Sequence, residues 1–448
     1  MRFALGGVRS YGRCVLLAAT LASASLAAQT NRIDVITPSA PELAAFAAHA
    51  VGVRTLTAVD RHRPDVLRTT PGSATARYDR SFTLEVWYPA TLAPGQRAEG
   101  TYRTIGRDPE IAVTLTGRAV RDAAPTTTGA PFPLVIVSHG YPGNRFLMSH
   151  LGENLASKGY VVASIDHPES TYDDLKAFAS TLYNRAYDQR FVLNEMARLG
   201  ASGSGGPLAG LVDASRTAVV GYSMGGYGVV NLVGGAYRDA AASFPAAPPN
   251  GLLRERTAAD PAYRASIDPR VKAAVAIGPW GMHVGYWDAA GLAGIRTPML
   301  FVAGSVDDVS GYEKGTRAIF EGAVNADRYL LTFLNAGHNA AAPIPAPREV
   351  YAGAADGTRA PPFLHYADPV WDNVRMNNVL QHMVTAFVDL HLKGLSDRRA
   401  YLDVVPHGKD GVFALDADGT PKPEHTYWKG FKRGTAVGLV MEHRAPAR

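Results

Sequence analysis

Apolar segments alternate with helical segments from residue 131 to residue 394, and this alternation restricts the fold more than any other feature of the chain. The segment FPLVIVSHG (132–140) is continuously apolar and ends in a turn, as strands buried on both faces do. The segment RFLMSHLGENLASKG (145–159) repeats leucine at helical spacing. Further strands are expected at 160–168, 216–223, 271–280, 297–308 and 327–338, and further helices at 183–200, 311–323 and 375–394. The alternation predicts an α/β fold whose mostly parallel central sheet is covered by helices on both faces.

Two more strands are expected before this region, at 51–60 and 80–90, where apolar, β-branched and aromatic residues alternate with polar ones. A short helix is expected around IAVTLTGRAV (111–120). Two proline-rich insertions, 238–270 and 339–372, interrupt the alternation, and they fit either walls of a binding site or plain surface loops. We therefore expect one domain over residues 29–394, with a C-terminal extension, 395–448, packed on it.

The first 28 residues have the pattern of a secretory signal peptide: three arginines, a short apolar run and a small-residue end at SASLAAQ. An amphipathic N-terminal helix is the alternative. The apolar run is too short to span a membrane, so the chain is expected to be secreted or periplasmic, with no stable membrane anchor. Cys14, the only cysteine, lies in this segment, so the mature chain is expected to have no thiol and no disulfide.

Composition excludes some functions. The net charge of +5 includes the three arginines of the leader, and no basic tract with interleaved aromatics occurs, so no nucleic-acid partner is expected. The chain also lacks the H-E-x-x-H, C-x-x-C and G-x-x-x-x-G-K-[ST] patterns. We therefore expect no metal site and no cofactor.

The stretch VVGYSMGGYG (219–228) places a serine between glycines directly after a predicted strand. Gly221, Ser223 and Gly225 form the G-x-S-x-G pattern, which in a strand–turn–helix context exposes a nucleophilic serine on a sharp turn. A glycine-rich packing turn is the alternative. Ser223 is the predicted nucleophile.

Partners for this serine follow in the order acid, then histidine. Asp307 and Asp308 come at the end of the strand LFVAGSVDDV, and Asp307 is preferred because of its spacing from Gly304. One of the two aspartates could instead cap a helix. His338 comes directly after the last predicted strand, in FLNAGHNA. In such a triad the histidine removes the serine proton, and the aspartate orients the imidazole and stabilises its cation.

The tetrahedral oxyanion of acyl transfer needs backbone N–H donors. Met224, directly after the nucleophile, and Tyr141, in the turn HGYPGN (139–144), are the expected donors. His139, in the same turn, is a candidate for contact with substrate, but it is expected mainly to brace its loop.

The segments VIVSHGYPGNR, GYSMGGYG, GSVDD and NAGHN resemble the secreted dienelactone-hydrolase-like and platelet-activating-factor-acetylhydrolase-like branch of the α/β-hydrolase superfamily. The resemblance covers roughly residues 50–395 and implies a serine hydrolase acting on carboxylic esters without a cofactor. True dienelactone hydrolases use a cysteine nucleophile, where this chain has Ser223. The chain also resembles bacterial cutinases and polyester hydrolases in the position of Trp280. The chain differs from them in Tyr222, where they have histidine, and in lacking their disulfide. The resemblance makes Trp280 and Tyr222 candidates for contact with substrate, and Trp280 would either stack on an aromatic acyl group or cap the core.

These observations predict a secreted serine esterase whose substrates are small-molecule or polymeric esters, with short-chain or aromatic acyl groups favoured. An amidase or lactonase using the same triad, or a non-catalytic binding protein of this fold, are the alternatives.

Overall fold

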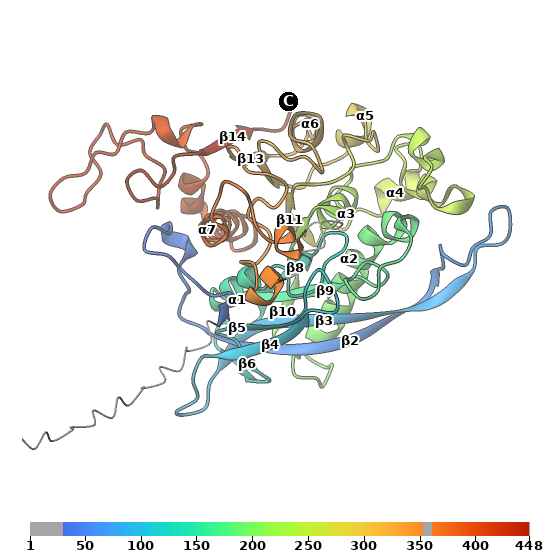
Figure 1. Cartoon of the computed structure of the whole chain (residues 1–448), viewed down its shortest axis with the longest axis horizontal. Coiled ribbons are helices and arrows are strands. Elements are labelled where there is room, and N and C mark those ends of the chain that lie inside the picture. Colours follow the sequence, from blue (N-terminus) through green and yellow to red (C-terminus); the bar gives the residue numbers. More distant parts are fainter. Residues whose placement is uncertain (1–29, 353–360, 448) are drawn as a thin grey trace, which may run out of the picture. The chain divides into compact units, whose positions relative to one another are not determined.

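The computed structural model describes residues 30–352 and 361–447, and its main feature is a large central sheet (Figure 1). In this part of the chain the sheet has eleven strands in the order β14-β13-β12-β11-β10-β8-β9-β3-β2-β6, with β7 paired to β3. The strands are β2 (Ala50–Pro64), β3 (Arg77–Thr91), β6 (Val120–Arg121), β7 (Ala124–Pro125), β8 (Phe132–Ser138), β9 (Val161–Asp166), β10 (Val212–Tyr222), β11 (Val271–Ile277), β12 (Met299–Gly304), β13 (Arg328–Phe333) and β14 (Leu439–Arg444).

The strands from β9 to β13 in this order are all parallel to one another. Antiparallel strands flank them: β3 pairs with β9 on one side, and β14 pairs with β13 on the other. Because parallel strands end at the same edge, the loops that follow β8, β10, β12 and β13 meet there. The predicted α/β class with a mostly parallel sheet is confirmed.

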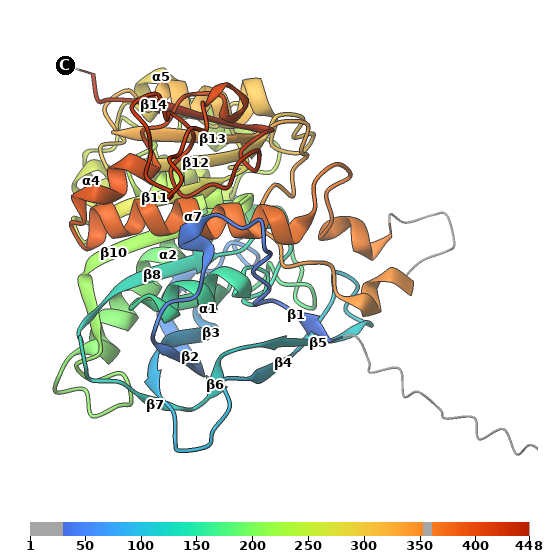
Figure 2. The ribbon, with the colours of Figure 1, turned by 90° about the vertical axis from the view of Figure 1, so that its left-hand side faces the viewer.

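Helices cover both faces of the sheet, and each face has its own core. Alternate residues of one strand divide between the cores: Val135 and Val137 of β8 pack with α1 and α7, whereas Leu134 and Ile136 pack with α2, α3 and α6. In Figure 2, α7 lies in orange across the strands. The α-helices are α1 (Ser149–Ser157), α2 (Phe178–Gly200), α3 (Met224–Leu232), α4 (Pro261–Ala265), α5 (Ala289–Leu292), α6 (Ala318–Gly322) and α7 (Asn373–Leu392). No helix in the described ranges is long and apolar enough to cross a bilayer.

The N-terminal strand pair forms a long antiparallel hairpin, β2 with β3, drawn in blue in Figure 1. The helix expected at 111–120 is wrong. That segment contains β5 (Ala112–Gly117), which pairs with β1 (Asn31–Arg32) and β4 (Gly100–Ile105) in a separate three-stranded sheet. Val113 and Leu115 alternate with exposed neighbours, which is the period of a strand with one buried face.

Short helical turns occupy the two insertions. Within 238–270 lie η2 (Asp239–Ser243), η3 (Pro249–Arg256) and α4, and within 339–372 lie η5 (Arg348–Ala352) and η6 (Pro362–His365). The C-terminal residues supply η7 (Ser396–Tyr401), η8 (Gly408–Asp410) and β14, which forms one edge of the sheet. Two further short helical segments are η1 (Glu42–Ala44), before β2, and η4 (Tyr312–Arg317), before α6. The predicted signal peptide falls outside the described residues.

Candidate active site

A sharp turn between β10 and α3 holds Ser223. Its backbone has φ +54° and ψ −114°, in the left-handed half of conformational space that serine rarely adopts. The N–H of Ser223 donates to the carbonyl of Ile277 (2.8 Å), and the N–H of Tyr227 donates to the carbonyl of Ser223 (2.9 Å). These bonds connect the turn to β11 and to the first turn of α3, and they hold Ser223 in this strained conformation.

The glycines around Ser223 are needed because backbone or side-chain atoms approach them closely. A Cβ atom at Gly221 would lie 2.2 Å from the carbonyl oxygen of Gly225. A Cβ at Gly225 would lie 2.0 Å from the carbonyl oxygen of Ser138, and one at Gly228 would lie 2.5 Å from Cγ of Arg185. The turn that holds Ser223 between β10 and α3, called the elbow below, therefore packs against β8 and α2 at distances that only glycine permits.

We expect Gly225→Ala to lower the free energy of unfolding by about 3 kcal/mol, because the new methyl group would force the backbone of β8 to move. Gly203→Ala is the matched control, since a Cβ there meets no atom within 4 Å, and its effect should stay within about 0.5 kcal/mol. Urea unfolding followed by circular dichroism measures both. Equal midpoints for the two variants would contradict the close packing of the elbow.

Asp307 and His338 lie beside Ser223, each in the loop that follows a parallel strand. His338 Nε2 is 2.9 Å from Ser223 Oγ, and His338 Nδ1 is 2.9 Å from Asp307 Oδ2. Asp307 Oδ1 also accepts from the N–H groups of Val309 (2.9 Å) and Ser310 (2.8 Å). Asp308, the alternative acid, is exposed to solvent and has no hydrogen bond to His338. The structure thus brings together Ser223, Asp307 and His338.

The electrostatics of Asp307 favour its ionised form. Burial alone would raise the pKa of this carboxyl, but the hydrogen bond from His338 and the two backbone donors outweigh burial and lower the pKa below its usual value. A carboxylate in this position accepts a proton-bearing Nδ1 and leaves the lone pair of Nε2 directed at Ser223 Oγ. Among the described residues, no group of three or more His, Cys, Asp or Glu side chains is arranged to hold a metal ion.

Tyr222 packs beside His338. Its ring lies 5.1 Å from the ring of His338, and its hydroxyl donates to Asn339 Oδ1 (3.0 Å). Asn339 in turn donates to the carbonyls of Leu364 (2.8 Å) and Ala367 (2.7 Å), so the second insertion is connected to the histidine loop. Tyr222 is only 3% exposed, which leaves little of its side chain for the substrate contact that the sequence suggested.

Two backbone N–H groups, on segments that flank Ser223, have no acceptor in the described part of the chain. Met224 is the first residue of α3, and Tyr141 lies in the loop after β8. Neither N–H donates a hydrogen bond within residues 30–352 and 361–447. The loop after β8 also lies against the elbow, because a Cβ on Gly140 would be 3.3 Å from Ser223 Cβ. The two predicted oxyanion donors therefore lie on segments that flank the serine.

Aromatic rings extend from this loop along one side of the site. Tyr141 and Trp280 both contact Phe178, the first residue of α2, in edge-to-face geometry with ring centroids 5.0 Å apart. The backbone N–H of Trp280 donates to the carbonyl of Ser223 (3.2 Å). The half-buried indole of Trp280 also contacts Tyr286. Trp280 is thus joined to the elbow itself. The sequence did not single out Phe178, which lies before the helix expected at 183–200.

His139 is buried in the loop after β8. Its ring is 1% exposed, its Nδ1–H donates to the carbonyl of Gly140 (2.7 Å), and its Nε2 accepts from the N–H of His167 (3.1 Å). This burial leaves little of the His139 side chain for the substrate contact that the sequence suggested, and its two hydrogen bonds lie within the buried loop region. Burial, with the nearby Arg185 guanidinium, lowers the pKa of His139 well below its ordinary value.

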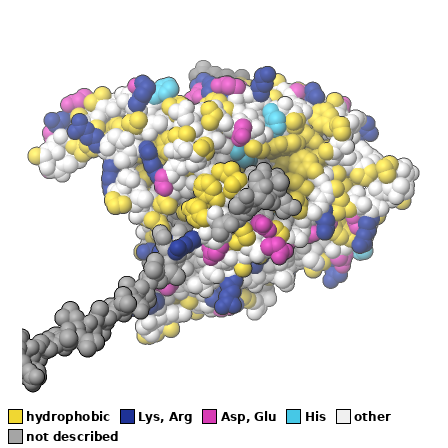
Figure 3. Space-filling model, in the orientation of Figure 1, with side chains coloured by type: hydrophobic (Ala, Val, Ile, Leu, Met, Phe, Trp, Pro, Cys, Tyr) yellow, Lys and Arg dark blue, Asp and Glu magenta, His cyan; other side chains and the backbone are white. Residues whose placement is uncertain are grey.

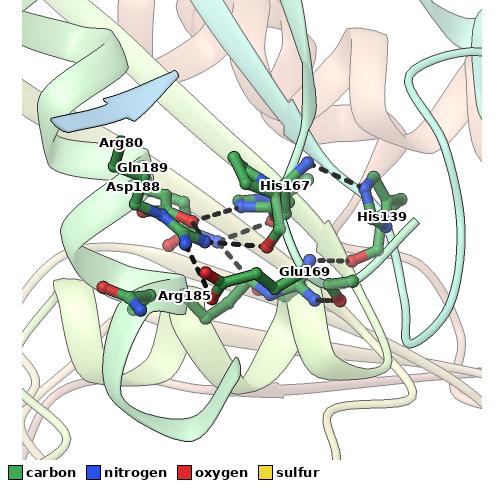
Figure 4. A network of polar contacts seen from close by, with 12 residues as sticks. Arg80, His139, His167, Glu169, Arg185, Asp188 and Gln189 are labelled. Carbon is green, nitrogen blue, oxygen red and sulfur yellow. Dashed lines mark hydrogen bonds and ion pairs between the residues drawn. The ribbon is translucent and has the colours of Figure 1, made fainter. Parts of the chain in front are cut away.

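A buried polar network next to His139 was missed in the sequence (Figure 4). Ser138 Oγ is 2.8 Å from His167 Nε2, and His167 Nδ1 is 3.0 Å from Asp188 Oδ2. This repeats the order serine, histidine, aspartate, but Ser138 is 0% exposed and also receives a hydrogen bond from Gln189 (2.9 Å). It is therefore a structural network and not a second reactive centre. The spacing of Arg185, Asp188 and Gln189 on one face of α2 was the available signal.

Comparisons with known proteins agree with this architecture. The family model described as PET hydrolase-like matches residues 117–253, which include the elbow. A cutinase, est1, from Thermobifida alba is 28% identical over 205 residues, covering 46% of this chain and 52% of the cutinase. Platelet-activating factor acetylhydrolase from Cavia porcellus is 37% identical over 68 residues, covering 14% of this chain and 16% of that enzyme. The chain spans about half the length of the curated cutinases that it matches.

A solved structure extends the likeness to most of the chain. A ferulic acid esterase from Streptomyces cinnamoneus superimposes with a TM-score of 0.54 at 25% sequence identity, covering 79% of this chain and 94% of the esterase. The match confirms the α/β-hydrolase fold. The predicted resemblance to the branch that includes platelet-activating factor acetylhydrolases is also confirmed.

Proposed function

We propose that this relative of cutinases and of PET hydrolase-like proteins is a secreted serine hydrolase that cleaves carboxylic esters through an acyl-enzyme. The observation that carries the proposal is the continuous hydrogen-bonded path from Asp307 through His338 to Ser223 Oγ, with separations of 2.9 Å at both steps. A serine hydroxyl is a weak nucleophile at neutral pH unless a base removes its proton. The path supplies that base together with the carboxylate that orients it.

In this mechanism Ser223 Oγ attacks the acyl carbon while His338 Nε2 takes the serine proton. His338 then gives the proton to the leaving alcohol, and Asp307 stabilises the imidazolium that forms between the two steps. Water attacks the acyl-enzyme in the same way and releases the acid. The N–H groups of Tyr141 and Met224, which donate to no acceptor among the described residues, stabilise the oxyanion. One such donor contributes about 3 kcal/mol in the transition state.

The acyl group is proposed to be short or aromatic. The rings of Tyr141, Phe178 and Trp280 next to the elbow offer faces and edges on which an aromatic acyl group can pack. Exposed apolar side chains also lie close to a triad residue in the sequence: Val306 directly precedes Asp307, and Val309 follows two residues after it. Figure 3 shows hydrophobic side chains gathered over a broad area in the middle of the displayed face. Such a surface suits an apolar ester, whether small or polymeric.

A substrate panel tests the proposal. The protein without residues 1–28 should hydrolyse p-nitrophenyl acetate, butyrate and benzoate faster than the decanoate, and p-nitroacetanilide slowest of all. Trp280→Ala should lower kcat/KM for the benzoate about 5-fold and for the acetate much less, because the lost stacking is worth about 1 kcal/mol. Trp280→Phe, which keeps a ring, is the matched control.

Other outcomes would favour the alternatives. Faster turnover of the anilide than of the esters would point to an amidase. A folded protein that cleaves no member of the panel would overturn the hydrolase and leave a binding role. Equal losses on acetate and benzoate in Trp280→Ala would contradict an aromatic acyl site. Export is tested separately, by mass spectrometry of the N-terminus after expression of the full chain.

A further inference from the structure

The buried network in Figure 4 connects α2 to the loop that carries the proposed oxyanion donor Tyr141. Three of its members, Arg185, Asp188 and Gln189, project from one face of α2. Asp188 is the centre of negative charge. It accepts two hydrogen bonds from Arg80 of β3, both 3.0 Å, in addition to the one from His167. The network is therefore fixed to the sheet as well as to the helix.

Arg185 is the member that touches the loop. Its guanidinium donates to the carbonyl of His139 (2.7 Å) and to the carbonyl of Gly140 (3.3 Å), and it also donates to Ser170 Oγ (2.5 Å). The planar fork of an arginine can hold two neighbouring carbonyls at once, which an ammonium group does poorly. Gly140 receives a second bond, from His139 Nδ1 (2.7 Å). Both carbonyls before Tyr141 are thus held by buried donors.

The direction of the Tyr141 N–H follows from these bonds. The Gly140 carbonyl and the Tyr141 N–H belong to one planar peptide group, and in a trans peptide they point in opposite directions. A carbonyl held toward Arg185 and His139 therefore turns the N–H away from the network. That N–H has no acceptor in the described part of the chain, and Gly140 lies against Ser223.

The charge of Arg185 is maintained although the residue is 1% exposed. Burial lowers its pKa to about 9, while the nearby Asp188 carboxylate opposes that change. The guanidinium is thus protonated at neutral pH, and all its hydrogen bonds go to neutral oxygens. Asp188 remains ionised, because its bonds from Arg80 and His167 outweigh burial and lower its pKa. The Asp188 carboxylate thus balances the positive charge of Arg185 without accepting a hydrogen bond from it among the described residues. The Arg185 guanidinium keeps its hydrogen bonds for the two loop carbonyls and Ser170.

We propose that Arg185 is a positioning residue for the hydrolase: by holding the carbonyls of His139 and Gly140, it fixes the Tyr141 N–H as an oxyanion donor. The inference rests on the proposed function, since an oxyanion forms only if Ser223 attacks an acyl group. Arg185 touches neither substrate nor the reacting atoms. Its effect is on the orientation of one peptide group.

The test compares Arg185→Gln with Arg63→Gln. Arg63 belongs to the same network, with bonds to Asp188 Oδ1 and Asn184 Oδ1, both 3.2 Å, but it has no hydrogen bond to the loop. We expect Arg185→Gln to lower kcat for p-nitrophenyl acetate about 10- to 100-fold, less than outright loss of a donor, with KM changed less than about 3-fold. The affinity for an alkyl trifluoromethyl ketone, which forms a tetrahedral oxyanion on the serine, should fall by a similar factor.

The Arg63→Gln variant should lose thermal stability comparably but keep kcat and the ketone affinity within about 3-fold. Equal losses of kcat in both variants, or a loss confined to KM, would overturn the proposal. If Arg185→Gln does not fold, Arg185→Lys replaces it, and full activity in that variant would overturn the proposal as well. Failure of the proposed function has a different signature, because wild type itself would then be inactive.

Discussion

Replacing Ser223 by alanine is expected to lower kcat for p-nitrophenyl acetate by a factor of about 10⁴ or more, because the variant cannot form the acyl-enzyme. His338 Nε2 would then face a methyl group in place of the hydroxyl it now contacts at 2.9 Å. The residual rate would come from substrate binding and oxyanion stabilisation alone. The measurement is steady-state hydrolysis, with circular dichroism to show that the variant folds.

Ser138→Ala is the matched control, because Ser138 also contacts a histidine that is backed by an aspartate. A fluorophosphonate should label wild type and Ser138→Ala on Ser223 and should leave Ser223→Ala unlabelled. Turnover that persists in Ser223→Ala, or label found on another serine, would mean that the elbow does not hold the nucleophile.

Replacing Asp307 by asparagine is expected to lower kcat about 10⁴-fold, because the imidazole of His338 would lose the partner that fixes its tautomer and stabilises its cation. Asp308→Asn changes the neighbouring residue in the same way, and it should leave kcat within about 2-fold because Asp308 is exposed. Both variants are compared with wild type on p-nitrophenyl acetate at pH 8. A larger loss of kcat in Asp308→Asn than in Asp307→Asn would mean that Asp308 is the acid that orients His338.

The effect of Asp307→Asn on the free energy of unfolding is expected to depend on pH. The folded pKa of Asp307 lies below its ordinary value, so the folded state binds fewer protons at this group than the unfolded state does. Its contribution to stability is therefore present above about pH 4 and is lost as the pH falls through the folded pKa. The difference in free energy of unfolding between wild type and Asp307→Asn should shrink over that range. A difference that grows on acidification would contradict the lowered pKa.

Much of the architecture was predictable because buried parallel strands leave a strong signal. Each strand from β8 to β13 contains a short apolar run, and the order of strands and helices implies that their carboxyl ends meet at one edge. That rule brings Ser223 near His338, although they are 115 residues apart in sequence. Local spacing also favoured Asp307 over Asp308, and the structure places Asp307 beside His338.

Other features had no local signal. The segment 111–120 alternates only from Ala112 to Leu115, which is too short a stretch to exclude a helix, and its pairing with β4 and β1 makes it a strand. The network around Asp188 is built from β3, the loop after β9 and α2, so its members are far apart in sequence. Charged residues such as Arg80 and Arg185 are usually exposed, and their burial follows from partners that only the tertiary fold supplies.

The conformation of Ser223 has a consequence for any attempt to improve this protein. A serine held at φ +54° costs the native state about 1–3 kcal/mol, a cost that glycine would largely avoid. Laboratory evolution that rewards heat resistance alone would therefore favour glycine at this position and discard the reactive hydroxyl. Mutant libraries of this chain need selection for turnover in every round, because thermostability and catalysis make opposite demands on residue 223.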